Sequence, residues 1–513
     1  MSNVGDNTFF KKLDVTQFAV LISLVFSIWC IVVDDVINSD GILYLETARY
    51  FLEGNWAAAY QHYNWPFYSA LIALVSAITP LSLEHSAFTI NVFFQCLIVY
   101  MFLAILKELG ASKQVLIAGA VLLLANVNLN EYRDYIIRDF GYWGMYLTAI
   151  WLMIRFKTSG HLRYALGWNL AIILASLFRV EGLVFLLFAP LILLFVDTHG
   201  QGRFSATVKC YSLTIVVMVT SLLWVMLSQS GFTEFGRLIE PVQKIQFFID
   251  TILTTIPAKA DQLSDVILNR YSESYGIYGV WALLLTILVM KILDMTGWLA
   301  LLLLFATAFG RKIRQQVQQY QIIMGFIVIN FAVISLFLIS NFYLVGRFVI
   351  ALALLLLMFA AFALSYFYRW TGWQTHRRLM KPALLRGALV LVVFAMLVDG
   401  LVSFGSSKHY IRDAAQWLED NTAAEASLYS NNMPLYFYSG RWADKKALAH
   451  ARNTIEKGTL NRNIIRQYDY MAIRVSRKQQ ALRQQLQKLY SSHFIYEAKN
   501  ERGDAVMIFQ INL

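Results

Sequence analysis

The segment Phe348–Tyr366 reads FVIALALLLLMFAAFALSY and contains no charged residue. An α-helix needs about 20 apolar residues to cross the hydrocarbon core of a bilayer, and this segment approaches that length. Similar windows recur along most of the chain, which is 58% hydrophobic and only 15% charged. A soluble domain of 513 residues could not bury so much apolar surface, so the sequence predicts an integral membrane protein.

We predict an α-helical polytopic protein with about eleven transmembrane helices. Their windows are Phe18–Val33, Phe88–Leu106, Val115–Val127, Gly141–Phe156, Tyr164–Phe178, Leu183–Val196, Leu213–Leu227, Trp298–Phe309, Ile322–Ile339, Phe348–Tyr366 and Ala388–Val398. The first window follows Lys11 and Lys12 but precedes no small-residue cleavage site, so we interpret it as a retained helix. The run Tyr278–Asp294 fits either an interfacial helix or part of a long eighth span.

The distribution of basic residues predicts the orientation in the membrane. With Lys11 and Lys12 in the cytoplasm, the other basic loops fall on the same side, as the positive-inside rule requires. Those loops carry Lys107 and Lys113, Arg155 to Arg163, Arg203 and Lys209, Arg311 to Arg314, and Arg369 to Arg386. The basic residues behind the net charge of +11 are therefore explained by membrane topology, and we expect no nucleic-acid partner. We expect a multi-pass protein of the cytoplasmic (inner) membrane with its N-terminus inside.

The outer side then receives the loops 34–87, 128–140 and 231–275 and the whole tail. We expect residues 1–402 to form the transmembrane domain and residues 403–513 to form a small α/β domain in the periplasm or outside the cell. In the tail, a helix near Gln479–Tyr490 precedes a predicted hairpin that joins Phe494–Ala498 to Ala505–Ile511. The C-terminus is therefore expected outside the cytoplasm.

The first outer loop begins with three carboxylates, Asp34, Asp35 and Asp40. Ser39 or Asp40 is expected to cap the helix that follows. Asp40, Tyr44, Ala48 and Leu52 recur every four residues and so share one face of that helix. The pattern predicts an amphipathic helix along the membrane surface. An Asp that only caps the helix is the alternative for Asp40, and a solvated stop signal is the alternative for Asp34 and Asp35.

Three further charged sites lie at outer helix ends. Arg138 and Asp139 precede the fourth span, in a segment that also fits an interfacial belt of Tyr, Trp and Arg. Arg179 and Glu181 occupy a tight bend between two spans; charges so near hydrocarbon are functional or form a salt bridge.

The remaining site precedes the span that begins at Phe348. There Tyr343 and Arg347 lie next to hydrocarbon. The planar fork of Arg347 suits a phosphodiester, and interfacial snorkelling is the alternative.

The run from Asp40 through Tyr44, Ala48 and Leu52 to Gly54 and Trp56 continues into an aromatic-Pro-aromatic step at 65–67. This pattern resembles the first external loop of polytopic C-type (GT-C) glycosyltransferases. These include protein O-mannosyltransferases, of the dolichyl-phosphate-mannose-protein mannosyltransferase-like family, and lipid A aminoarabinose transferases. The chain departs from many of them in having Asp40-Gly41 where they have an Asp-Glu pair, and in a slightly shorter gap to the Gly-x-Trp step.

The resemblance implies transfer of a sugar from a polyprenyl-phosphate donor to a lipid, glycan or protein acceptor on the outer face of the membrane. It implies that Asp40 is the base of an inverting reaction, and that Asp139 is a second catalytic residue beside the donor phosphate or a metal. The residues expected to bind substrate are Asp35, Tyr44, Arg138, Arg179, Glu181, Tyr343 and Arg347. No cofactor is certain, and a divalent metal stays possible.

Two other classes of protein remain as alternatives. A lipid or solute transporter needs polar groups within its spans, whereas the ionisable residues here gather at outer ends. A polysaccharide polymerase or ligase uses similar lipids and also carries outward Arg and Asp residues. The sequence has no glycine-rich phosphate loop, no Gly-x-Ser-x-Gly nucleophile and no metal-ligand spacing among its eight histidines, which disfavours ATP and nucleotide-sugar chemistry.

Overall fold

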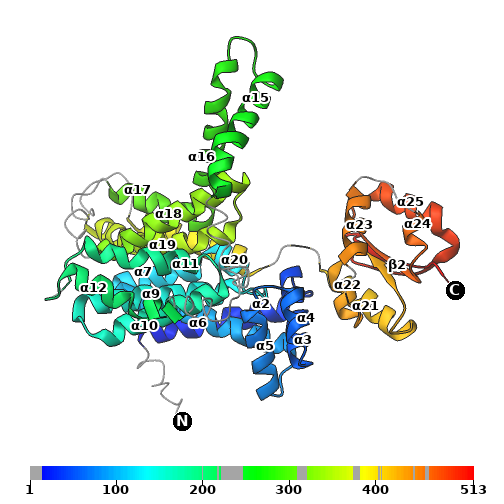
Figure 1. Cartoon of the computed structure of the whole chain (residues 1–513), viewed down its shortest axis with the longest axis horizontal. Helices are drawn as coiled ribbons and strands as arrows, with labels where there is room; N and C mark the ends of the chain where they lie inside the picture. The colour runs from blue at the N-terminus through cyan, green and yellow to red at the C-terminus, as the bar shows by residue number, and fades with distance from the viewer. Residues whose placement is uncertain are drawn as a thin grey trace.

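The computed structural model describes residues 14–512 except 199, 217–218, 221–245, 309–319, 374–381, 403–404, 406, 443–444 and 457–461. Lys11, Lys12, the basic run 311–314 and most of the window Leu213–Leu227 therefore lie outside the described residues. The described chain is mainly helical, with one four-stranded sheet near the C-terminus (Figure 1). The predicted fold class is confirmed.

Helices that come mostly from the predicted windows form the main body. Its helices are α2 (Val15–Val33), α6 (Leu83–Glu108), α7 (Lys113–Leu124), α9 (Asp139–Ser159), α10 (Leu162–Phe178), α11 (Gly182–Phe188), α12 (Arg203–Cys210), α17 (Trp298–Ala308), α18 (Gln321–Asn341), α19 (Gly346–Trp373) and α20 (Pro382–Leu401). In the described residues, five helices are long and apolar enough to cross a membrane, at 15–33, 83–108, 273–296, 321–341 and 346–368. The chain is thus a multi-pass membrane protein, and the count of eleven spans stays a prediction.

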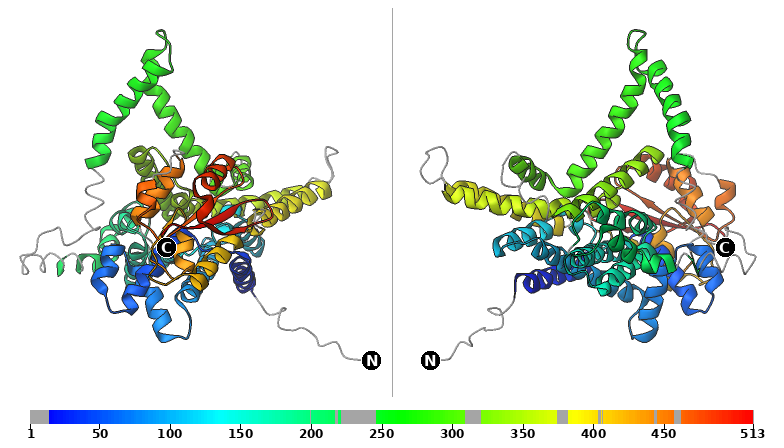
Figure 2. Two further views of the ribbon diagram at one scale, coloured as in Figure 1. Left: turned by 90° about the vertical axis from the view of Figure 1, so that its right-hand side faces the viewer. Right: turned by 60° about the vertical axis from the view of Figure 1, so that its left-hand side comes forward.

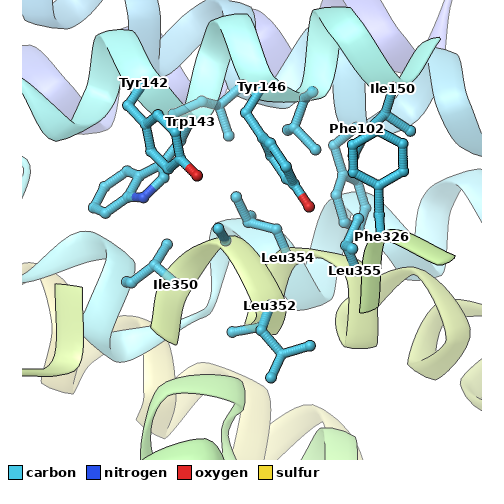
Figure 3. Packing of buried hydrophobic residues seen from close by; sticks show 14 of the residues in the cluster. Phe102, Tyr142, Trp143, Tyr146, Ile150, Phe326, Ile350, Leu352, Leu354 and Leu355 are labelled. Atoms are coloured by element: carbon cyan, nitrogen blue, oxygen red, sulfur yellow. The ribbon is translucent and has the colours of Figure 1, made fainter. Parts of the chain in front are cut away.

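Helices α9 and α19 contribute side chains to the same buried core. Tyr142, Tyr146 and Ile150 of α9 face Ile350 and Leu354 of α19 (Figure 3), and all five are almost fully buried. The order of these residues in Figure 3 shows that the two helices run in the same direction. Their N-termini therefore lie at the same end of the body, and each presents a partial positive charge there.

Short helices outside the main body connect α2 to α6. They are α3 (Ser39–Leu52), α4 (Trp56–His62) and α5 (Phe67–Ile78), and α8 (Val127–Asn130) precedes α9. The N-cap of α3 is Asn38, and its side chain makes no capping hydrogen bond. The predicted cap at Ser39 or Asp40 is therefore wrong by one or two residues. The Asn38 amide makes no capping bond because it is hydrogen-bonded to the backbone of Ile136. Asp40 lies in the first turn of α3.

The uncertain run Tyr278–Asp294 belongs to one continuous helix, α16 (Gly276–Thr296). With the preceding α15 (Ile256–Val266), it forms a hairpin that stands out from the other helices (Figures 1 and 2). Gly297, with a φ of 90°, separates α16 from α17, so α16 is not part of a long eighth span. Asn126 donates to the carbonyl of Met295 over 3.1 Å, which places the end of α16 beside α8.

The tail contains an α/β unit with the sheet order β1-β2-β4-β3. Its elements are α21 (His409–Asn421), β1 (Leu428–Ser430), α22 (Met433–Tyr438), α23 (Lys445–Glu456), α24 (Arg462–Ile465), β2 (Tyr470–Val475), α25 (Gln480–Tyr490), β3 (Phe494–Lys499) and β4 (Ala505–Gln510). Strands β1 and β2 are parallel and the other pairs antiparallel, so the predicted hairpin of β3 and β4 is confirmed. Helices α21 and α22 pack on one face, and α23, α24 and α25 on the other. The predicted boundary between residues 402 and 403 stays a prediction.

Candidate functional site

Five of the predicted site residues meet at one end of the main body, at the starts of helices and at one bend. Nη1 of Arg347 lies 2.8 Å from Oδ2 of Asp40 and 3.7 Å from Oδ2 of Asp139. Arg179 binds Asp139, and its Nη2 lies 2.8 Å from Oε1 of Glu181. We call these residues, which are separated by up to 307 positions in the sequence, the arginine–carboxylate cluster.

The cluster has a buried part and an accessible part. The side chains of Asp139 and Arg179 are 3% and 5% exposed, whereas those of Asp40 and Arg347 are 44% and 27% exposed. The guanidinium of Arg179 also lies 4.3 Å from the centre of the Phe348 ring. Removing Arg179 would leave the buried carboxylate of Asp139 and the half-buried one of Glu181 without this partner, at a cost of about 3–5 kcal/mol. A ligand can therefore reach the pair of Asp40 and Arg347 first.

The charge of Arg179 keeps the half-buried carboxylate of Glu181 ionised. Burial alone would raise the pKa of Glu181, but the Arg179 guanidinium outweighs burial and the pKa falls to about 2. The salt bridge expected for Arg179 and Glu181 is thus present, and it continues to Asp139. The bend that carries both residues is tight, because a Cβ on Gly182 would lie 2.7 Å from the Ser176 backbone.

Arg138 and Tyr44 lie beside the cluster. The guanidinium of Arg138 is 5.6 Å from the centre of the Tyr63 ring, and its buried Nη1 has no hydrogen-bond partner in the described chain. Tyr44 is 5% exposed and packs edge-to-face on Tyr63 and Tyr68. Burial raises the pKa of Tyr44, so its hydroxyl stays protonated. The unpaired Arg138 nitrogen is a donor that an anionic ligand can use.

The amide of Asn38, which the sequence analysis did not identify, holds the two acidic loops together. Its Oδ1 accepts from the Ile136 N–H over 2.8 Å, and its Nδ2 donates to the Ile136 carbonyl over 3.2 Å. Gly41 allows this approach, because a Cβ there would lie 2.9 Å from Cβ of Ile136. Ile136 is three residues from Asp139, so these contacts fix Asp40 relative to Asp139.

Arg133 is a second residue that the sequence analysis missed. It is 2% exposed and donates to Ser27 Oγ over 2.7 Å and to Asn130 Oδ1 over 2.8 Å. These bonds anchor the loop before α9 to α2. The charged run around Asp134 was the only signal for it, and the buried serines of α2 lie inside an apolar window that gives no hint of a partner.

Asp35 and Tyr343 are not part of the cluster. Tyr343 is 55% exposed, and its ring packs edge-to-face on Phe337. Oδ2 of Asp35 accepts from Ser407 Oγ and from the Lys408 N–H, each over 2.7 Å. Asp35 instead lines an open cavity of about 590 Å³. We call it the acidic cavity, because its lining includes Asp34, Asp35, Glu131, Asp134 and Asp399.

The possible divalent metal does not fit the arrangement at Asp40 and Asp139. Nη1 of Arg347 already contacts both carboxylates, so a cation there would meet a guanidinium. Within the described ranges, no group of three His, Cys, Asp or Glu side chains is arranged to hold a metal ion. A divalent metal elsewhere in the protein stays a prediction.

The fold is similar to that of solved structures of ArnT and of an archaeal oligosaccharyltransferase, so the fold that the resemblance implied is confirmed. ArnT from Cupriavidus metallidurans bound to undecaprenyl phosphate has a TM-score of 0.53 and 10% identity, over 96% of this chain and 97% of that one. The oligosaccharyltransferase AglB from Archaeoglobus fulgidus, in complex with an inhibitory peptide and a dolichol-phosphate, has a TM-score of 0.52 and 11% identity, over 91% and 70%.

A second structure of the A. fulgidus oligosaccharyltransferase, tethered to an acceptor peptide, has a TM-score of 0.50 and 13% identity. That match covers 81% of this chain, which spans only 58% of the length of that enzyme. No family model matches the sequence, and no curated protein matches it. At such low identities the likeness is one of fold.

Proposed function

We propose that the chain is a membrane glycosyltransferase that moves a sugar from a polyprenyl-phosphate donor to an acceptor hydroxyl or amine. The observation that carries this proposal is the accessible pair of Arg347 and Asp40, with the unpaired Nη1 of Arg138 beside the same cluster. A base next to phosphate-binding arginines is the arrangement that glycosyl transfer from a phosphodiester needs. Two structures of similar fold hold a polyprenyl phosphate, undecaprenyl phosphate in ArnT and dolichol-phosphate in AglB.

In the proposed reaction, the guanidinium of Arg347 releases the carboxylate of Asp40 and binds the donor phosphate in its place. The acceptor oxygen or nitrogen attacks the anomeric carbon, and its proton passes to the freed carboxylate of Asp40. The bond from the anomeric carbon to the phosphate oxygen breaks on the opposite face, so the configuration inverts. Polyprenyl phosphate leaves with the bonding electron pair, and Arg347 and Arg138 stabilise its added negative charge. No ATP is required, because the donor is already activated.

Asp139 acts in this scheme by holding the arginines, and not as the base. It is buried and is shared by Arg179 and Arg347. The positive ends of α9 and α19 add to the attraction for the phosphate, since both helices begin at the cluster.

We place the site on the outer face of the cytoplasmic membrane, with the N-terminus inside. Reporter fusions after Arg314, Arg369 and Leu513 test this orientation: the first two should report cytoplasm and the last should report the outside. A cytoplasmic signal at Leu513 would contradict it.

The test of the activity is mass spectrometry of envelope lipids, polysaccharides and proteins from cells with and without the gene. We expect one sugar-bearing product to disappear from the cells without it, and to return with wild-type protein but not with Asp40→Asn. A transporter would instead move a polyprenyl-phosphate sugar across proteoliposomes and would do so equally well as Asp40→Asn. That outcome would contradict the proposal.

A further inference from the structure

A buried glutamate and a histidine face each other between α3 and α4, outside the arginine–carboxylate cluster. The side chain of Glu46, in α3, is 3% exposed, and that of His62, the last residue of α4, is 12% exposed. Nε2 of His62 lies 3.3 Å from Oε2 of Glu46, and the other carboxylate oxygen, Oε1, has no hydrogen-bond partner in the described chain. Tyr50 packs against His62, with ring centres 5.6 Å apart, and is itself stacked on Trp442 of the tail. Burying a carboxylate is costly even with one partner, so packing alone does not account for the pair.

The hydrogen bonds of Thr47 determine which protons His62 carries. Oγ1 of Thr47 lies 2.7 Å from the carbonyl oxygen of Leu43, and two oxygen atoms so close must have a proton between them. A carbonyl has no proton, so the single hydroxyl proton of Thr47 points to Leu43. Nδ1 of His62 lies 3.0 Å from the same Oγ1. The remaining lone pairs of Oγ1 can only accept, so Nδ1 of His62 carries a proton and donates it.

This assignment leaves one proton to be shared between Nε2 of His62 and the carboxylate of Glu46. A neutral imidazole with its proton on Nδ1 offers only a lone pair at Nε2, and an ionised carboxylate also offers only lone pairs. These two acceptors would repel each other at 3.3 Å. The contact is favourable when His62 is an imidazolium or when Glu46 is a carboxylic acid. Each of these states holds one proton more than the neutral imidazole beside an ionised carboxylate.

The residue after His62 connects this pair to the arginine–carboxylate cluster. Tyr63 packs edge-to-face on Tyr44, with ring centres 5.5 Å apart, and the Arg138 guanidinium lies 5.6 Å from the centre of the Tyr63 ring. A cation within about 6 Å of a ring centre is attracted to the ring. Nη1 of Arg138 is the buried donor without a partner that we propose for the phosphate. Because His62 holds the end of α4 on α3, it also determines where Tyr63 meets Arg138.

We infer that Glu46 and His62 share one proton, and that the protonated pair positions Arg138 for the donor phosphate through Tyr63. Glu46 and His62 are positioning residues, because they act through Tyr63 and Arg138 and not on the reacting atoms. When the pair loses its proton at high pH, the contact between Nε2 and Oε2 becomes repulsive and the end of α4 is held less firmly. This inference rests on the proposed binding of the donor phosphate beside Arg138.

The first test asks whether His62 acts through Arg138, and it measures binding of undecaprenyl phosphate to the full-length protein in nanodiscs. His62→Ala should weaken binding several-fold. The matched control His161→Ala, at an exposed histidine whose side chain makes no capping bond, should bind as wild type. In the Arg138→Ala background, His62→Ala should cause little further loss, because the two residues act in one chain of contacts. The same fold-loss in both backgrounds would overturn the positioning role.

The second test asks whether the pair shares a proton, and it compares Glu46→Gln with wild type from about pH 6 to about pH 9.5. The new amide can donate to Nε2 of a neutral His62, so this variant needs no additional proton. Glu46→Gln should bind undecaprenyl phosphate as wild type at the low end of the range and several-fold more tightly than wild type at the high end. Arg49, Tyr50, Tyr63 and the ligand are the same in both proteins, so their own charges cancel in the ratio of affinities at each pH. A ratio that stays constant over the range would overturn the shared proton.

The thermal midpoint separates a failure of this inference from a failure of the proposed function. If wild-type protein does not bind undecaprenyl phosphate at any pH, the proposed function fails. The shared proton is then tested by stability alone, because the repulsion between Nε2 and Oε2 arises without a ligand. The midpoint of Glu46→Gln should rise relative to that of wild type as the pH increases, and a constant difference would overturn the shared proton.

Discussion

The arginine–carboxylate cluster and the acidic cavity draw on the same two loops. The segment after α2 supplies Asp35 to the cavity and Asp40 to the cluster, five residues apart. The loop before α9 supplies Asp134 to the cavity and Asp139 to the cluster, also five residues apart. The difference lies in the partners: Arg179 and Arg347 offset two of the three carboxylates of the cluster, whereas Lys408 is the one basic residue among the described residues that line the cavity.

The pKa values of carboxyl groups in the two sites differ accordingly. Burial, with Asp34 adding to it, raises the pKa of Asp134 to about 7, whereas Arg179 lowers that of Glu181 to about 2. An anionic phosphate is repelled by the carboxylates of the cavity, whereas Arg347 and the unpaired Nη1 of Arg138 offer it cationic donors at the cluster. We therefore expect donor chemistry at the cluster and none at the cavity.

The largest effect on sugar transfer should come from neutralising one carboxylate in the cluster, compared with neutralising one in the cavity. Asp40→Asn keeps the size of the side chain but cannot take a proton, so transfer should fall by about two to four decades. The matched variant Asp35→Asn makes the same change in the cavity and should leave transfer near wild type. The assay is transfer from a lipid-linked sugar in membranes. Loss of transfer in Asp35→Asn or Asp139→Asn, with Asp40→Asn still active, would mean that the base is elsewhere.

A smaller effect should follow from loosening the link between the two loops. Asn38→Ala removes both hydrogen bonds to Ile136, which lets Asp40 drift relative to Asp139. We expect kcat to fall by about tenfold, since small misplacements of a reacting group are costly. The affinity for polyprenyl phosphate and the thermal midpoint should stay near wild type. An unchanged kcat would show that Asn38 does not position Asp40.

The smallest effect concerns stability in the acidic cavity. The folded protein keeps a proton on Asp134 up to about pH 7, whereas an unfolded Asp loses it near pH 4. Stability therefore falls as the pH rises from about 4 to 7, and the loss persists above pH 7. Asp134→Asn should raise the thermal midpoint by a few degrees at pH 8 and leave it unchanged at pH 4. The exposed control Glu425→Gln should shift neither, and equal midpoints for Asp134→Asn and wild type at pH 8 would contradict the raised pKa.

Most helices could be predicted from sequence because a helix that lies in a bilayer needs a long run of apolar residues, which is visible in the sequence. The windows Phe88–Leu106 and Ile322–Ile339 fall inside α6 and α18. The run Tyr278–Asp294 was ambiguous because an apolar composition does not show where a helix breaks. In the structure the break is at Gly297, whose φ is 90°. Strand β2 was missed because six residues around Arg474 give little period-two signal.

Part of the site could be predicted because charged residues stand out beside apolar windows. Asp40, Asp139, Arg179 and Arg347 each stand out as charges at the end of an apolar window. Which of them meet depends on packing between helices far apart in the chain, as between α9 and α19. Sequence position alone could not separate Asp35 from Asp40, and it gave no reason to single out Asn38, whose partner is about 100 residues away.

The central claim is that Arg347 binds the donor phosphate, and direct binding of undecaprenyl phosphate to the purified full-length protein tests it. Wild-type protein should bind undecaprenyl phosphate and not undecaprenol. Arg347→Lys keeps the charge but loses the two-pronged fork, so binding should weaken by about tenfold, and Arg347→Ala should weaken it further. Arg163→Lys, at a loop predicted on the opposite side, is the matched control and should bind as wild type. Wild-type affinity in Arg347→Ala would contradict the account.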